Sequence, residues 1–234
     1  MGAEIARQLA AQGGQVALVA RRESELTALM QEINSRSGAK RARSYVHDVH
    51  CYAEAPALFQ TICRDLGGLD LIVYAAGVMP RIAENEYSFE KDRAMLEVNV
   101  LGAVAWLNEA AQRFQAAGSG TIVGISSVAG DRGRQGQPVY CTSKAALNTY
   151  LEALRNRVGR HGVRIVTVKP GPVDTPMTQG LDKLPLLIPA SEAARQILAA
   201  AERGARTVYV PGKWRPIMAV IRAIPSPIFQ RMKI

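Results

Sequence analysis

Helical and strand-like patterns alternate along nearly the whole chain. Short apolar runs, at residues 69–74 and 163–168 for example, have the length of buried strands, and amphipathic segments of helical period stand between them. A helix that separates two strands carries the chain back to the edge where it started, so consecutive strands lie parallel. The sequence therefore predicts an α/β fold with a doubly wound, mostly parallel sheet covered by helices on both faces.

The pattern also assigns a residue range to each element. Strands are expected at 15–20, 43–46, 69–74, 121–125, 163–168 and 207–210, and helices before Gly13 and at 24–35, 56–66, 89–99, 103–117, 139–160 and 191–203. A proline-rich stretch at about 172–189 has no clear period, and we expect a substrate lid there, because long loops inside compact domains are usually functional. No repeat or linker divides the chain, so residues 1–234 are expected to form a single domain.

Charge and cysteine content narrow the partners and the compartment. Lys and Arg total 29 against 20 Asp and Glu, and the formal charge of +9 favours anionic partners. Cys51, Cys63 and Cys141 form no Cys-x-x-Cys pair, as expected of free thiols in a reducing compartment. The N-terminus lacks the apolar core of a signal peptide, and no apolar run approaches the ~18 residues of a membrane span. We expect a cytoplasmic protein whose membrane contact, if any, is peripheral and on the inner face.

A tyrosine and a lysine carry the clearest chemical signal. Tyr140 and Lys144 are spaced to lie one turn apart on the same face of a helix. Ser127 stands at the end of a predicted strand, and Asn99 ends an earlier predicted helix. A phenol has a pKa of about 10. A nearby cation lowers that pKa and so suits the phenol to general acid/base catalysis near neutral pH.

The order of these residues resembles that of the short-chain dehydrogenase/reductase family. Ala75-Ala76-Gly77 precedes them, Pro170-Gly171 and Thr175 follow them, and the likeness runs from Gly2 to about Val210. It implies a Rossmann-like sheet and an oxidoreductase that interconverts a carbonyl and an alcohol on a small molecule.

The resemblance also implies a role for each catalytic residue. Tyr140 is the general acid in carbonyl reduction and the general base in alcohol oxidation. Lys144 binds the nicotinamide ribose hydroxyls, Ser127 hydrogen-bonds the substrate carbonyl oxygen, and Asn99 holds a water in the proton relay. The nicotinamide cofactor supplies the hydride.

NADP, as NADPH in reduction, is the cofactor that the likeness indicates. Ala20 stands where members preferring NAD carry an acid, and Arg21 and Arg22 follow it. A guanidinium pairs with a 2′-phosphate in bidentate fashion, although two surface arginines that open a helix are the plainer alternative. The other residues matching cofactor-binding segments are Gly2, Asp48, Val49, Ala75, Ala76, Gly77, Tyr140, Lys144, Pro170, Gly171, Val173 and Thr175.

Two features depart from the family pattern. Tyr74 and Ala75 replace two asparagines whose side chains brace neighbouring strands, so that bracing must be made differently. The first strand and most of the glycine-rich turn that receives the pyrophosphate have no counterpart ahead of Gly2. We therefore expect a fold that is N-terminally truncated relative to the family, with Met1 an internal methionine of a longer chain.

Four potential metal ligands lie close together at His47, Asp48, His50 and Cys51. Alternate residues at a strand end point to opposite faces, and no second group of ligands follows. We therefore assign no metal site.

The C-terminal segment, residues 213–234, is basic and amphipathic. It contains no acid, and apolar residues alternate with its cations, which are Lys213, Arg215, Arg222, Arg231 and Lys233. Two interpretations stay open: the segment packs over the substrate cleft or a neighbouring subunit, or it docks on anionic lipid. Both favour a lipophilic substrate.

Two functions compete at this point. The first is catalysis as a homodimer or homotetramer, which the likeness implies through the helices at 103–117 and 139–160. The second is a non-catalytic binding or regulatory protein that keeps the reductase fold. Asn99, Ser127, Tyr140 and Lys144 favour catalysis, since a protein without turnover has no chemical reason to assemble them. Nucleic acid is not an expected partner.

Overall fold

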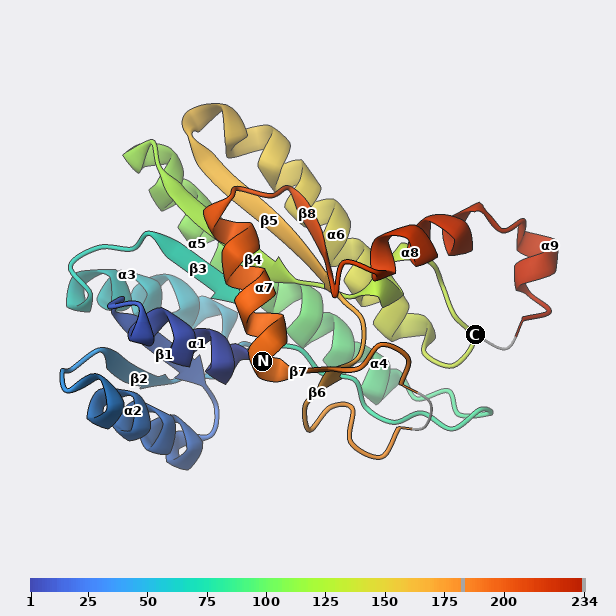
Figure 1. Cartoon of the computed structure of the whole chain (residues 1–234), viewed down its shortest axis with the longest axis horizontal. Coiled ribbons are helices and arrows are strands. Elements are labelled where there is room, and N and C mark those ends of the chain that lie inside the picture. The colour runs from blue at the N-terminus through green and yellow to red at the C-terminus, as the bar shows by residue number, and fades with distance from the viewer. Residues whose placement is uncertain (182–183, 233–234) are drawn as a thin grey trace.

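Helices and strands alternate in the structure as the sequence predicts (Figure 1). The computed structural model describes residues 1–181 and 184–232. The strands are β1 (Val16–Ala20), β2 (Ala42–Val46), β3 (Leu71–Tyr74), β4 (Gly120–Ile125), β5 (Val163–Pro170), β6 (Val173–Asp174), β7 (Ile188–Pro189) and β8 (Thr207–Val210). The helices are α1 (Gly2–Ala11), α2 (Glu23–Ser37), α3 (Ala55–Asp65), α4 (Phe89–Leu96), α5 (Gly102–Ala117), α6 (Pro138–Val158), α7 (Ala190–Glu202), α8 (Trp214–Ala223) and α9 (Ser226–Phe229).

Every described strand pair is parallel. The main sheet has the order β3-β4-β5-β8, and β1 pairs with β2 separately. Val73, Val123 and Val166 lie in register across the middle of the main sheet. The structure confirms the predicted α/β fold with a mostly parallel sheet.

Helices cover the main sheet on both faces. Ile5 of α1 and Ile197 of α7 pack with Val123 on one face, and Figure 1 shows α7 crossing in front of β4 and β5. Helices α3, α5 and α6 cover the other face, where Phe59 and Leu107 belong to a second apolar cluster. Burial on both faces explains why these strands are continuous apolar runs.

The two-stranded part has a separate packing cluster. Leu18 of β1 and Ala42 of β2 are buried with Leu26 and Ile33 of α2, and α1 also contributes to the cluster. In the described residues β1 pairs with β2 alone and β3 pairs with β4 alone, so each has one edge without a strand partner.

Asn99 lies within a helical segment and not at its end. The chain is helical from Phe89 to Ala117, and residues Glu97–Leu101 form a π-turn, η2, between α4 and α5. The prediction of a helix end at Asn99 was therefore wrong. A π-turn adds a residue to the helix without breaking it, and such turns are frequent at functional sites.

The predicted lid and the C-terminal segment are both attached to the body. Parallel pairing of β6 with β7 ties the two ends of the lid together. Asp182 and Lys183 of the lid, and Lys233 and Ile234 at the C-terminus, lie outside the described residues. Among the helices described, none combines the length and the apolarity that crossing a bilayer requires.

Candidate active site

Tyr140, Lys144 and Ser127 meet where β4 ends and α6 begins. Tyr140 and Lys144 face the same side of α6, with the Lys144 Nζ atom 5.7 Å from the centroid of the Tyr140 ring. Ser127 follows β4, and its hydroxyl lies near enough to the Tyr140 hydroxyl to lower the pKa of the phenol. Tyr140 and Lys144 are both buried. The structure thus brings these three predicted residues together.

Lys144 is a buried ammonium with few described partners. Its Nζ donates to the Ile125 carbonyl oxygen at 3.0 Å, the one hydrogen bond that the described residues provide. Burial lowers the pKa of Lys144 to about 8. An ammonium carries three donors, so two remain for a ligand with hydroxyl groups.

Two groups oppose the effect of burial on Tyr140. Burial raises the pKa of the phenol, while the neighbouring Ser127 hydroxyl and the charge of Arg134 lower it. From the sequence, Lys144 is the cation expected to lower this pKa. In the structure Arg134, in the loop before α6, is the cation that lowers the pKa of Tyr140.

Asn99 joins the end of β3 to α6 through its side-chain amide. Its Oδ1 accepts from the Val78 N–H at 2.8 Å, and its Nδ2 donates to the Val78 carbonyl oxygen and to Ser143 Oγ, each at 3.0 Å. A Cβ on Gly77 would lie 3.4 Å from both Asn99 Oδ1 and Lys144 Nζ. Gly77 therefore lies beside Lys144, and the water-holding role of Asn99 stays a prediction.

The loop after β4 is fitted closely against α6. Ser126 Oγ donates to the Lys144 carbonyl oxygen at 3.1 Å, and the Ala129 N–H donates to Ser127 Oγ at 3.1 Å. A Cβ on Gly130 would lie 2.6 Å from the Lys144 carbonyl carbon, so only glycine fits there. Backbone contacts hold Ser127 at a defined place relative to α6.

Comparison with known families decides the identity of this fold. A profile of the short chain dehydrogenase family matches residues 1–184. The chain belongs to the short-chain dehydrogenase family. Relatives include an uncharacterized oxidoreductase of Mycobacterium tuberculosis, 29% identical over 99% of this chain and 92% of that protein. Another, from Staphylococcus saprophyticus, is 32% identical over 78% of this chain and 77% of that protein.

Solved structures of short-chain dehydrogenases share the fold. A structure described as a short chain dehydrogenase/reductase family protein has a TM-score of 0.78 at 27% identity and covers 89% of both chains. The short-chain dehydrogenase from Sphingobium yanoikuyae in complex with NADPH has a TM-score of 0.82 at 22% identity, over 96% of this chain and 92% of that one. The chain is thus an oxidoreductase of this family.

Residues that the sequence predicts to bind the cofactor lie at the start of α1 and at the end of β3. A Cβ on Gly2, at the start of α1, would lie 3.4 Å from the Ala75 Cβ atom at the end of β3. Ala76 packs in the cluster beneath α3 and α5. Tyr74 replaces one of the family's asparagines, and its hydroxyl donates to the Val98 carbonyl oxygen at 2.6 Å. The strand end is therefore braced against the π-turn by a different side chain.

The end of β5 and the segment that follows it contain four more residues that the sequence predicts to bind the cofactor. Thr175 Oγ1 donates to the buried Val173 carbonyl oxygen at 3.3 Å, and Pro170 accepts a long hydrogen bond of 3.5 Å from Ser127 Oγ. A Cβ on Gly171 would lie 1.9 Å from Nε1 of Trp214, so a larger residue would displace the indole. Close approach to α8 thus requires glycine at this position.

The predicted phosphate-recognising residues are exposed and paired with carboxylates. Arg21 lies 3.7 Å from Asp48, and Arg22 lies 2.7 Å from Glu25. Asp48 also accepts from His50, and these partners lower the pKa of its carboxyl group against the effect of burial. Val49 lies next to Gly102 and packs in the main apolar cluster.

Several polar groups near the site were not singled out from the sequence. Arg134 Nε, Gln137 Oε1 and Trp214 Nε1 are buried without a described hydrogen-bond partner. No periodic pattern marks Arg134 or Gln137, because both lie in the loop before α6. They are donors and acceptors that a bound molecule can satisfy.

A buried ion pair supports the loop that carries Ser127. Lys169 Nζ lies 2.5 Å from Asp131 Oδ1, and the Tyr209 hydroxyl donates to Asp131 Oδ2 at 2.7 Å. This network joins the loop to the end of β5 and to β8.

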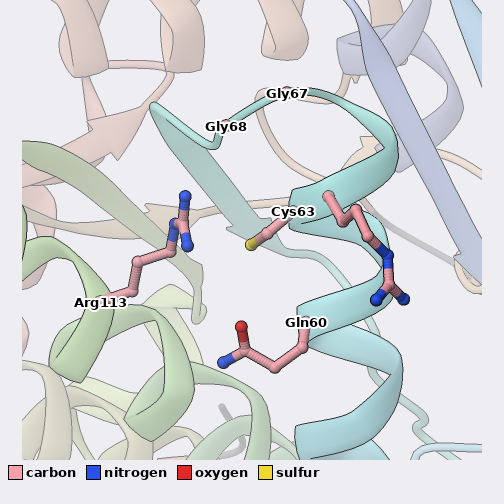
Figure 2. A pocket seen from close by; sticks show the side chains of 6 residues that line it. Gln60, Cys63, Gly67, Gly68 and Arg113 are labelled. Carbon is pink, nitrogen blue, oxygen red and sulfur yellow. The ribbon is translucent and has the colours of Figure 1, made fainter.

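The hollow in Figure 2 is a separate feature. It holds about 410 Å³ between α3 and α5 and contains none of the predicted site residues. Figure 2 shows Gln60 and Arg113 turned toward the sulfur of Cys63, whose thiol pKa is raised by burial. The hollow therefore lies apart from Tyr140, Lys144 and Ser127.

Residues at the end of β2 point in different directions, as the strand argument predicts. His47 is buried with its ring centroid 5.4 Å from that of Trp106, whereas His50 Nδ1 lies 2.7 Å from Asp48. Within the described residues no three His, Cys, Asp or Glu side chains gather as metal ligands.

Proposed function

We propose that the protein is an NADP(H)-dependent oxidoreductase that interconverts a carbonyl and an alcohol on a lipophilic small molecule, with Tyr140 as general acid/base. One observation carries the proposal. The Lys144 ammonium is buried beside Tyr140 with a single described acceptor, Ile125. A buried charge with unused donors is costly unless a ligand completes its hydrogen bonds.

The residues present fit a nicotinamide cofactor. Lys144 has free donors for ribose hydroxyls, and Gly77 leaves its surroundings uncrowded. The first N–H groups of α1, which begins at Gly2, have no intrahelical acceptors and suit a phosphate group. Pro170, Gly171, Val173 and Thr175 would line the nicotinamide side. When bound, the cofactor supplies or accepts the hydride.

Side chains of the protein would transfer the proton and bind the carbonyl oxygen. Ser127 would donate a hydrogen bond to that oxygen and so orient the carbonyl next to the phenol. Burial raises the pKa of Tyr140, which keeps the phenol protonated near neutral pH and able to donate to the oxygen during reduction. In alcohol oxidation the same oxygen atom would accept the proton, with help from Arg134.

Preference for NADP rests on Arg21 and Arg22. Both guanidinium groups are exposed, and their partners Asp48 and Glu25 are also partly exposed, so a 2′-phosphate can replace or share them. Asp48 is the group that would oppose a phosphate here.

Apolar side chains around Tyr140 support a lipophilic substrate. Met95 and Cys141 are buried with the tyrosine, and partly buried apolar residues pack against this cluster, namely Val78, Met79, Ile82 and Val139. The lid at 172–189 would close over the substrate from the opposite side.

The oligomer that we propose is a homodimer or homotetramer built on α5 and α6. A shallow hollow runs between these helices and is lined by residues of both, including Gln112, Gln115 and Arg157. Size-exclusion chromatography with light scattering tests this point. A monomeric mass at high protein concentration would contradict it.

A cofactor titration tests the proposed function. Fluorescence titration should give saturable binding of NADPH with a clear preference over NADH, followed by NADPH oxidation in the presence of lipophilic ketones or aldehydes. Binding without any turnover across such a panel would favour the non-catalytic alternative. Absence of binding to either cofactor would overturn the proposal.

A further inference from the structure

The C-terminal tail, residues 213–232 of the described chain, divides its side chains between two faces. On the inner face Trp214 and Met218 are buried together with Val128 and Tyr209. The Trp214 ring also stands against Gly171. The inner face therefore belongs to the body of the protein, next to the segments proposed to form the active site.

Arg132 holds the tail in this position. Its guanidinium donates to the Ile221 carbonyl oxygen at 2.7 Å and to the Ile224 carbonyl oxygen at 2.5 Å, and lies 4.0 Å from the centroid of the Phe229 ring. Carbonyl groups at a helix C-terminus lack intrahelical donors, so Arg132 satisfies the end of α8 and fixes the turn into α9.

The outer face leaves large aliphatic side chains in solvent. Ile217, Val220 and Ile228 are 37%, 66% and 57% exposed. Figure 1 shows α8 and α9 extending from the body at the end of the molecule away from β1 and β2. Exposed aliphatic residues that gather on one projecting segment indicate a surface that meets a partner.

Cations are interspersed with these aliphatic residues along the tail. Lys213, Arg215, Arg222 and Arg231 are all exposed, and residues 213–234 contain neither Asp nor Glu. The partner must therefore offer negative charge together with apolar material.

We propose that the outer face of the tail docks on a membrane surface that carries anionic lipid. Headgroups would meet the arginines, and the acyl boundary would receive Val220 and Ile228. A nucleic acid would pair with the cations but leave the aliphatic side chains in water. A second copy of the tail would bring like charges together. Anionic lipid satisfies both halves of the surface.

This orientation brings the proposed active site close to the bilayer. Val128, which contacts the inner face of the tail, directly follows Ser127 in the chain. A lipophilic carbonyl compound could then pass from the membrane to the site over a short path. This consequence rests on the proposed function, whereas the docking does not.

Vesicle co-sedimentation of the full chain tests the proposal. The protein should sediment with vesicles of phosphatidylcholine mixed with phosphatidylglycerol, bind far less to pure phosphatidylcholine, and be released by high salt. Arg222→Glu with Arg231→Glu should weaken binding by at least fivefold for each charge removed, since a cation near an anionic surface contributes about 1 kcal/mol. The control, Lys40→Glu with Arg160→Glu, makes the same net change elsewhere and should have a much smaller effect.

The aliphatic side chains are tested by Val220→Glu with Ile228→Glu, and Phe89→Glu, at an exposed position of α4, is the control. The double variant should lose binding, while its melting temperature and its NADPH titration stay those of the wild type. In a Val220→Trp variant, brominated lipid should quench the fluorescence of the introduced tryptophan. The proposal is overturned if no vesicle binds, if the aliphatic substitutions leave binding unchanged, or if they dissociate a dimer instead.

Discussion

The two parts of the sheet hold their predicted functional residues in opposite ways. In the part formed by β3, β4, β5 and β8, Asn99 and Lys144 are buried and hydrogen-bonded to backbone. In the part formed by β1 and β2, Arg21 and Arg22 have side chains 58% and 75% exposed, held by surface carboxylates. The first set has its geometry imposed by the core, and the second can rearrange around a ligand.

In the function that we propose, this contrast separates the residues of the chemistry from those that choose the cofactor. Substitutions in the buried group should change turnover or folding, because partners there have no water to replace a lost hydrogen bond. Substitutions among the exposed arginines should change cofactor affinity and little else, because exposed ion pairs contribute little to stability.

Removal of the Tyr140 hydroxyl gives the largest expected effect. Tyr140→Phe should lower kcat roughly 10²–10⁴-fold, because the general acid is lost. NADPH affinity should stay within about threefold, since the phenyl ring still fills the site. Stopped-flow kinetics and a cofactor titration measure the two quantities, and Tyr87→Phe, at an exposed position, is the control. Equal turnover in Tyr140→Phe and wild type would refute the assignment.

Lys144 should make the stability depend on pH. Its pKa is about 8 in the folded protein and about 10.4 in an unfolded chain, so between these values the unfolded state binds more protons. The wild type should therefore gain about 3 kcal/mol of unfolding free energy as the pH rises from about 8 to 10.5. Below pH 8 this group gives no pH dependence.

Urea unfolding of Lys144→Met and wild type at several pH values isolates that contribution. The variant should be the more stable protein at pH 7, and its advantage should shrink as the pH rises. Lys40→Met, at an exposed position, should show no such trend. A constant difference between Lys144→Met and wild type would contradict the buried charge.

Sequence patterns are sufficient to predict the strands of the main sheet, but they do not predict the π-turn. The apolar runs at β3 and β5 mark buried strands because both of their faces must be covered. The extra residue at Asn99 leaves no periodic mark, since its neighbours remain helical and apolar. Asp131 is beyond prediction for a related reason: its contacts with Lys169 and Tyr209 join segments that are distant in the sequence.

Tyr74 tests how the buried part tolerates a missing hydrogen bond. Tyr74→Phe removes the donor to the Val98 carbonyl and should cost roughly 1–3 kcal/mol of unfolding free energy. Tyr150→Phe also removes a hydroxyl, the one that donates to Asn108, but near solvent it should cost under about 1 kcal/mol. Equal costs in the two variants would contradict the distinction between buried and exposed partners.

Substitution of Arg21 and Arg22 tests the exposed residues of the part formed by β1 and β2. Arg21→Gln with Arg22→Gln should weaken NADPH binding about tenfold or more, as expected for loss of a charge-assisted pair, and leave NADH binding nearly unchanged. The melting temperature should not move. Arg36→Gln, another exposed arginine in an ion pair, is the control. An equal loss for both cofactors would show that the arginines do not recognise the 2′-phosphate.

Arg134 gives the smallest expected change. Its charge lowers the pKa of Tyr140, so Arg134→Gln should move the rise of alcohol oxidation rate to higher pH. The pH profile of kcat measures this shift, and Arg160→Gln should leave the profile where it is. A shift to lower pH would mean that the charge acts on another group.

Arg132 connects the tail to the segment that carries Ser127, five residues earlier in the chain. A small molecule that separates its guanidinium from Phe229 would loosen α9 and disturb the serine without occupying the cofactor or substrate site. Its inhibition would be noncompetitive toward both, which steady-state kinetics can distinguish. The cation–aromatic contact thus offers a point for selective control that lies apart from the chemistry itself.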